Sequence, residues 1–218
     1  MKLYFTRHGK TQWNQEKRFQ GMMGDSPLLP ESFAAIEALG ETLKDIPFEK
    51  IYTSSQKRAY LTAEGIIQHL KQPVPIVKTD DLRELGLGSL EGQLIEEMRE
   101  KYPTDLDNLR HHLENYHPEA FGGEPIEDML ARVDGLVGEA VLEAKEGPLL
   151  FVGHGAALTA AIQSLTGKPL SQLREQGGLF NNSLTVLETD HFEPPYKMVK
   201  WNDVSFLAGV NQQIDAML

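Results

Sequence analysis

The chain has 218 residues, 40% of them hydrophobic, and a formal net charge of −11. This length and hydrophobic content allow one sizeable core, so we expect a single domain spanning residues 1–218. The acidic balance argues against generic binding to nucleic acid or to anionic membranes. The lack of cysteine excludes disulfides and thiolate chemistry and fits a reducing cytoplasm. No apolar stretch approaches the roughly 18 residues of a membrane span.

Apolar runs alternate with helical patterns in the first half of the chain. Ser54 or Ser55 can serve as the N-cap of a helix, and Phe33 lies with Ile36 on the apolar face of another. The predicted strands are residues 2–6, 50–53 and, at an edge, 73–77. The predicted helices are residues 31–45, a helix that follows the serine pair, and residues 92–102.

The second half opens with a polar segment, residues 103–124, that interrupts this alternation. Together with the preceding helix it predicts a lid-like excursion over residues 92–124. Its three histidines could suggest a metal site, but their spacing does not support one, and a solvated lid face is the better interpretation; they are His111, His112 and His117. Helices follow at 125–144 and 156–166, and strands at 149–153, 184–188 and 196–201.

This alternation predicts a three-layer α/β fold, with a mostly parallel sheet and helices on both faces. The last two strands are close in sequence, so part of the sheet is expected to be antiparallel.

Several predicted strands end in residues that can bind an anion. The first strand runs into Arg7 and His8, the second leads to Arg58, and the strand at 149–153 is followed by His154. In open α/β sheets, ligands bind beyond the carboxyl ends of the strands. We therefore expect these four side chains to form one anion pocket.

Phosphate chemistry fits such a pocket. Arginine binds phosphate through bidentate, charge-assisted bonds, and a neutral histidine is a competent nucleophile toward phosphorus. A carboxylic acid must then protonate the leaving oxygen. Glu84 is the candidate, with Asp80, Asp81 and Glu91 as competitors.

Five motifs occur in order between residue 6 and about residue 158: TRHGKTQWN, IYTSSQKRAYLTAE, LRELGLGSLEG, GGEPIEDMLARV and FVGHGAAL. In these motifs the chain resembles the histidine phosphatase superfamily, which is phosphoglycerate-mutase-like in fold. The resemblance implies a metal-independent enzyme without a cofactor, and a small phosphomonoester as its substrate.

The resemblance also implies residue roles. His8 matches the histidine that becomes phosphorylated, and Glu84 matches the proton donor. The remaining matches are to phosphate-binding or pocket-rim residues: Arg7, Asn14, Gln20, Gly21, Arg58 and His154. Lys10 departs from the family pattern, which usually has Glu or Ala there, and adds positive charge beside the pocket. Glu84 must start protonated, which burial and the charge of the bound phosphate would favour.

We interpret the chain as a phosphomonoester hydrolase that forms a phosphohistidine, acts on small phosphorylated metabolites and exists as a monomer or homodimer. One alternative is a cofactor-dependent phosphoglycerate mutase. Mutases of the family usually have Arg-His-Tyr-Gly after the proton donor and an arginine pair in the excursion. Here Leu-Gly-Leu-Gly follows Glu84, and Arg110 stands in a mostly acidic excursion without an adjacent arginine. A non-catalytic phosphate-binding module is the second alternative, although it would be expected to lose His8 or Glu84.

Overall fold

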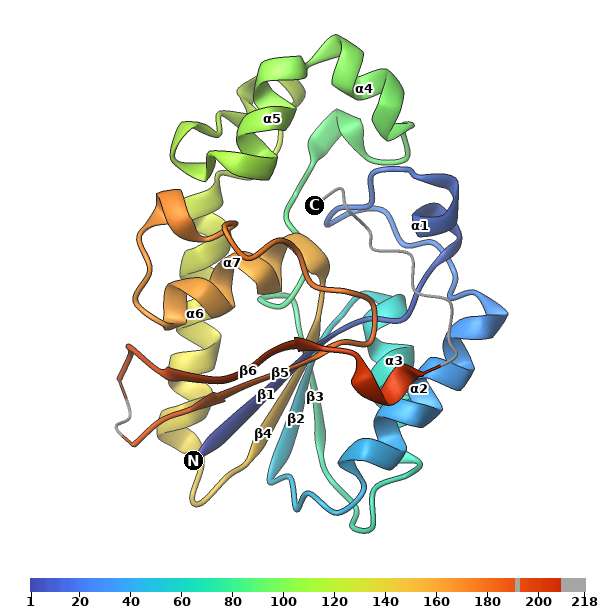
Figure 1. The fold of residues 1–218 in the computed structure, drawn as a ribbon, viewed down its shortest axis with the longest axis vertical. Coiled ribbons are helices and arrows are strands. Elements are labelled where there is room, and N and C mark those ends of the chain that lie inside the picture. The colour runs from blue at the N-terminus through green and yellow to red at the C-terminus, as the bar shows by residue number, and fades with distance from the viewer. Residues whose placement is uncertain (191–192, 209–218) are drawn as a thin grey trace.

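A central sheet organises the computed structural model, which describes residues 1–190 and 193–208 (Figure 1). Within these residues the sheet has six strands: β1 (Lys2–Arg7), β2 (Lys50–Ser54), β3 (Ile76–Thr79), β4 (Leu149–Gly153), β5 (Leu184–Glu188) and β6 (Lys197–Asp203). Their order is β3-β2-β4-β1-β5-β6. The first four strands pair in parallel, and β5 and β6 are antiparallel to their neighbours. The expected mostly parallel sheet is confirmed.

Helices cover both faces of the sheet (Figure 1). The helices of the described residues are α1 (Gln12–Glu16), α2 (Pro30–Leu43), α3 (Lys57–Ile67), α4 (Ile95–Lys101), α5 (Pro103–His111), α6 (Ile126–Glu143) and α7 (Gly155–Leu165). The pair α2 and α3 packs on one face, and the pair α6 and α7 packs on the other. No helix in the described part of the chain is both long enough and apolar enough to cross a membrane.

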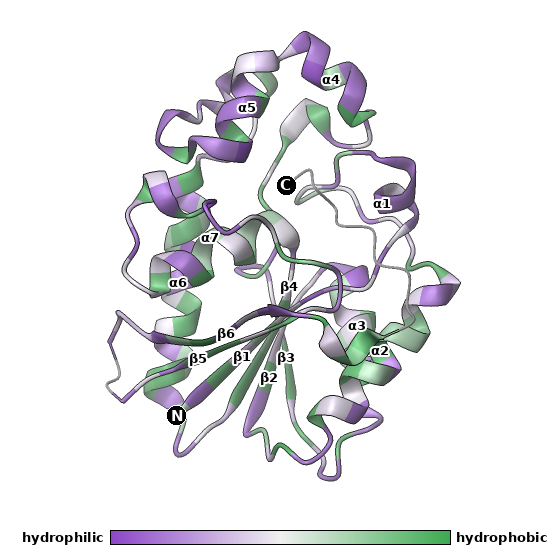
Figure 2. Cartoon of the chain, viewed as in Figure 1, coloured by the Kyte–Doolittle hydropathy of each residue, from purple (hydrophilic) through white to green (hydrophobic). Residues whose placement is uncertain are grey.

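The position of β4 inside the sheet explains why its sequence is wholly apolar. Leu149 and Phe151 belong to the core under α6 and α7, whereas Leu150 and Val152 belong to the core under α2 and α3. Side chains alternate between the faces of a strand, so a strand covered on both sides is apolar throughout. Figure 2 shows this apolar centre, with hydrophilic residues on the outer helices.

Two local predictions were wrong. Phe33 lies on the outward side of α2, where 54% of its surface is exposed. Neither serine caps α3, because its N-cap is Gln56, whose side chain makes no capping bond. The carboxylate of Asp25 accepts the N–H bonds of Lys57 and Arg58 instead. A distant loop therefore performs the capping.

The segment between β3 and α6 projects beyond the carboxyl ends of the strands (Figure 1). It contains α4, α5 and three 3₁₀ turns: η1 (Gly88–Leu90), η2 (Leu113–Asn115) and η3 (Pro118–Phe121). The helix α5 was not predicted, because its composition is mostly polar. Its apolar side chains Leu106 and Leu109 nevertheless join the core under α6, as do Leu113 of η2 and Phe121 of η3. The three excursion histidines are exposed.

The buried face between α6 and α7 contains one carboxylate, Asp134. Burial raises the pKa of Asp134 to about 6, although a 2.7 Å hydrogen bond from the Ser164 hydroxyl acts in the opposite direction. The folded protein therefore binds this proton more tightly than the unfolded chain, whose carboxyl has the usual value of 3.8. Stability from this group is greatest below pH 4 and falls as the pH rises through 6.

We expect Asp134→Asn to raise the free energy of unfolding at pH 8 by about 1–3 kcal/mol, because no buried charge remains. The gain should shrink toward zero near pH 4, as measured by urea unfolding at a series of pH values. Glu139→Gln, at an exposed position on the same helix, is the control and should give no such pH-dependent gain. A constant difference across the pH range would contradict the prediction.

Candidate active site

Two histidines lie side by side at the carboxyl ends of two neighbouring strands in the middle of the sheet. The strands β1 and β4 are parallel neighbours, and their register pairs Arg7 with Gly153. His8 and His154 each come one residue later, and their ring centroids are 5.2 Å apart. Both side chains are buried, with 2% and 0% exposure. The pairing of the two strands thus brings together residues that are far apart in sequence.

The hydrogen bonds of His8 define which ring nitrogen carries the lone pair. Nδ1 lies 2.7 Å from the carbonyl oxygen of Gly9. A carbonyl only accepts, so Nδ1 carries the hydrogen and Nε2 has the lone pair. Nε2 accepts a 3.3 Å bond from Nε of Arg58. Burial, and then the charges of Arg58 and Arg7, hold the pKa of His8 well below its usual range, so the imidazole is neutral at physiological pH.

Arg58 is buried in the first turn of α3 and is held by the loop at residues 21–25. Its guanidinium donates to the carbonyl oxygens of Gly24 (2.7 Å) and Gly21 (3.2 Å) and pairs with Asp25 at 3.1 Å. Burial lowers the pKa of Arg58, and the nearby carboxylates of Asp25 and Glu84 oppose that shift. Arginine remains cationic at any physiological pH.

Arg7 is fixed from the opposite side by residues 179–182. Its guanidinium donates a 2.9 Å bond to the carbonyl oxygen of Leu179. The amide nitrogen of the Asn181 side chain donates to the His8 carbonyl oxygen at 2.9 Å. Gly155 makes room for this arginine, because a Cβ there would lie 3.2 Å from Cζ of Arg7.

Glu84 lies against the start of α7, for which His154 is the N-cap. Glu84 is 2% exposed, and its carboxyl oxygens accept backbone bonds from Leu85 (2.9 Å), Ala156 (3.1 Å) and Ala157 (2.8 Å). These bonds hold both oxygens of the carboxyl group in place.

The three competing carboxylates are placed differently. Asp80 and Asp81 are exposed and bond to Ser55 and Thr79. Glu91 accepts the backbone N–H groups of Met23 and Gly24 and so holds the loop at residues 21–25. Of the four candidates, Glu84 is the one at the histidine pair.

His154 has two buried ring nitrogens, and neither has a hydrogen-bond partner among the described residues. Burial, followed by the charges of Arg58, His8 and Arg7, holds its pKa well below the usual range. A buried polar group without a partner calls for an explanation, and a bound ligand is one. The two histidines and two arginines are therefore a candidate anion site.

Comparison with known proteins identifies the family. Residues 3–204 match the model of the histidine phosphatase superfamily (branch 1). The chain belongs to this superfamily. A Bacillus subtilis protein named uncharacterized phosphatase PhoE is 33% identical over 161 residues, which cover 74% of this chain and 75% of the relative. The probable phosphoglycerate mutase GpmB of Salmonella paratyphi A is 33% identical over 173 residues, 78% and 76% of the two chains.

The fold agrees with solved structures of the same superfamily. The structure of Bacillus stearothermophilus YhfR superposes with a TM-score of 0.86 at 32% identity, covering 94% of this chain and 98% of the other. With phosphatase-named relatives and this family match, the chain is a phosphomonoesterase acting on small phosphorylated substrates. The expected phosphoglycerate-mutase-like fold is confirmed.

The other predicted site residues of this histidine phosphatase lie between β1 and α2, with Asn14 in α1 and the other two in the loop that follows. The Asn14 side-chain oxygen accepts from the backbone and hydroxyl of Thr11. Gln20 is buried, and its amide links the hydroxyl of Thr11 to Ser26. Gly21 contributes its carbonyl oxygen to Arg58. Gln20 and Gly21 thus brace the loop that holds this arginine.

Sequence reasoning missed the residue that supports Glu84. Arg132 on α6 donates to the carbonyl oxygens of Asp81, Arg83 and Glu84 and forms a two-bond ion pair with Glu124, at 2.8 Å for each bond. Both residues lie in the motif GGEPIEDMLARV. The motif places the opposite charges of Glu124 and Arg132 eight residues apart. That spacing is the sequence signal from which this ion pair could have been predicted.

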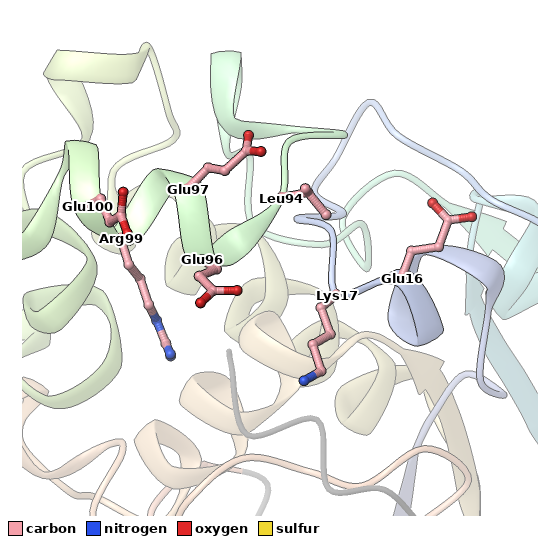
Figure 3. Close-up of a pocket in the computed structure, with 7 residues that line it drawn as sticks. All are labelled: Glu16, Lys17, Leu94, Glu96, Glu97, Arg99 and Glu100. Carbon is pink, nitrogen blue, oxygen red and sulfur yellow. The ribbon is translucent and has the colours of Figure 1, made fainter.

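A groove of about 680 Å³ lies between the end of α1 and the helix α4 (Figure 3). The groove contains no predicted catalytic residue. Figure 3 shows Lys17 and Arg99 extending from opposite sides of it among several carboxylates. Its lining residues are Glu16, Lys17, Leu94, Glu96, Glu97, Arg99 and Glu100.

The described residues offer no group of three or more His, Cys, Asp or Glu side chains that could hold a metal ion.

We expect Arg132→Gln to lower the free energy of unfolding by roughly 2–4 kcal/mol, because it leaves Glu124 and three carbonyl oxygens without their donor. Urea unfolding followed by circular dichroism measures this. Lys44→Gln is the control, since its pair with Glu41 is solvent-exposed and should contribute less than about 1 kcal/mol. Equal losses in both variants would contradict the central role of Arg132.

Proposed function

We propose that His8 is the nucleophile of this phosphatase and that Arg7, Arg58 and His154 bind the transferring phosphate. The observation that carries the proposal is the pair of buried, neutral histidines beside two buried arginines. Phosphate requires cationic hydrogen-bond donors, and the attack on phosphorus requires an imidazole lone pair. Nε2 of His8 has that lone pair next to Arg58.

In the first step, Nε2 of His8 forms a bond to phosphorus while the bond from phosphorus to the alcohol oxygen breaks. The positive groups stabilise the charge on the three equatorial oxygens. Glu84, protonated in the substrate complex, donates its proton to the leaving alcohol. In the second step, water attacks phosphorus and gives its proton to Glu84, the P–N bond breaks, and phosphate leaves with His8 neutral again.

The contacts of Glu84 support this role. Its carboxyl oxygens accept backbone N–H bonds from Ala156 and Ala157 at the start of α7, and His154 is the N-cap of that helix. A proton donor must lie within hydrogen-bond reach of the leaving oxygen, and these bonds fix the carboxyl group beside the proposed phosphate site.

Asn14, Gln20 and Gly21 complete the proposed pocket. Because Thr11 engages the side-chain oxygen of Asn14, the amide nitrogen of Asn14 would face the phosphate. Gln20 has a second amide hydrogen beyond the one given to Thr11, and Gly21 acts through Arg58.

We also propose that residues 92–124 act as a lid and that the enzyme is a cytoplasmic monomer or homodimer. The absence of cysteine supports the cytoplasmic compartment.

Replacing His8 by Ala should reduce hydrolysis of p-nitrophenyl phosphate by at least about a thousandfold, because the covalent step is lost. Rates are measured with wild type and variant at equal concentration, with circular dichroism to verify folding. The matched control is His117→Ala, which removes an exposed histidine of the excursion. More than about one per cent residual activity in the His8 variant would overturn the assignment.

Glu84→Gln should slow alkyl phosphates far more than p-nitrophenyl phosphate, because nitrophenolate leaves without needing a proton. We expect at least about a tenfold difference between the two losses in kcat/KM. Asp80→Asn is the control from the same motif region and should slow neither class. Equal slowing of both ester classes by Glu84→Gln would show that Glu84 supports structure instead.

A further inference from the structure

Gln56 occupies the N-cap of α3, a position that usually holds a short polar residue. Its side chain makes no capping bond, and the carboxylate of Asp25 accepts the N–H groups at the start of this helix instead. The residue is 7% exposed. The amide of Gln56 is therefore withdrawn from water and available for partners outside its own helix.

The amide of Gln56 bonds to two separate segments of the chain. Its nitrogen donates to the carbonyl oxygens of Gly21 (2.9 Å) and Gly24 (3.2 Å). Its oxygen accepts a 3.0 Å bond from the backbone N–H of Glu84. Carbonyl oxygens only accept and a peptide N–H only donates, so these partners fix which end of the amide is the nitrogen. A hydrocarbon side chain of the same length could make none of these bonds.

The two glycine carbonyl oxygens that bind Gln56 are the same two that bind Arg58. The guanidinium of Arg58 donates to Gly24 at 2.7 Å and to Gly21 at 3.2 Å. A carbonyl oxygen has two lone pairs and can accept from both side chains. Gln56 therefore holds the carbonyl groups that orient this arginine, and Nε of Arg58 in turn contacts Nε2 of His8.

The other end of the amide is bonded to the residue proposed as the proton donor. The peptide N–H of Glu84 donates to Gln56, whereas the carboxyl oxygens of Glu84 accept from the start of α7. The backbone and the carboxyl group of Glu84 are thus held by different elements. One side chain connects the backbone of the acid to the loop that orients the phosphate-binding arginine.

Attachment of this loop does not depend on Gln56 alone. The carboxylate of Glu91 accepts the N–H groups of Met23 and Gly24 and also that of Leu87, so it already ties the loop to the segment after Glu84. What the amide of Gln56 adds is a direct connection to Glu84 itself. A role in loop stability alone does not require that third bond.

We propose that Gln56 is a positioning residue of the phosphatase reaction and sets Glu84 relative to Arg58. The inference rests on the proposed function, in which the acid protonates the leaving oxygen while the arginine stabilises the equatorial oxygens. These two groups act on the two sides of the breaking P–O bond, so their relative position affects the rate of that step. A misplacement of about 1 Å can lower a rate by about a hundredfold.

The first test uses Gln56→Met, which keeps the unbranched shape of the side chain and removes all three bonds. We expect kcat/KM for glycerol 3-phosphate to fall by about a hundredfold. The loss for p-nitrophenyl phosphate should be about tenfold or less, because nitrophenolate leaves without needing a proton. Gln163→Met is the matched control: it changes a buried glutamine of α7 whose amide bonds to Gln176, and it should leave the ratio of the two esters unchanged.

A second variant separates the two ends of the amide. Gln56→Glu keeps an oxygen for the N–H of Glu84 and loses the amide donors to the loop. The ratio of kcat/KM for the two esters should therefore stay within about threefold of the wild type. The inhibition constant of vanadate, a mimic of five-coordinate phosphorus, should rise by about fivefold or more, because Arg58 loses part of its support.

The outcomes distinguish this inference from the proposed function. Equal slowing of the two esters by Gln56→Met, or a lower free energy of unfolding with both rates unchanged, would show a structural role and overturn the positioning role. If Gln56→Met does not fold, an ester ratio in Gln56→Glu that departs tenfold from the wild type would overturn it. Failure of the wild type to release phosphate from either ester would instead overturn the proposed function.

Discussion

The parallel pairing of β1 with β4 is the contact on which the rest of the site depends. Because Arg7 is in register with Gly153, His8 and His154 follow as neighbours at the same edge of the sheet. A slip of one residue would turn one side chain to the opposite face. In the observed register the two helical layers bury alternate residues of β4. The packing of the core and the geometry of the candidate site therefore both depend on the pairing of β1 with β4.

The second constraint is the positive charge that surrounds the two histidines. Arg58 is held mainly by carbonyl oxygens, with Asp25 as its only ion-pair partner among the described residues. Carbonyl groups orient the guanidinium without neutralising it, so much of its charge still acts on the pocket. The same charge that attracts phosphate also lowers the pKa of both imidazoles. Together with burial, the positive charge that would attract an anion therefore also keeps Nε2 of His8 unprotonated.

The sequence was most informative where local pattern and long-range structure agree. The strands β4 and β5 were predicted to the residue because apolar runs end at turns, and the histidines were found because they follow such runs. The helix α5 was missed because few apolar side chains anchor it. The capping of α3 by Asp25 was missed as well, since the loop and the helix are about thirty residues apart. Contacts between distant loops leave no periodic signal.

The same limitation applies to Arg132, and its position clarifies the role of Glu84. Arg132 on α6 donates to the backbone carbonyl of Glu84, and the backbone N–H groups of Ala156 and Ala157 on α7 donate to its carboxyl oxygens. The two helices pack against each other on one face of the sheet. Under the proposed function, the group that gives a proton to the leaving oxygen is therefore fixed by the same pair of helices that buries one side of β4.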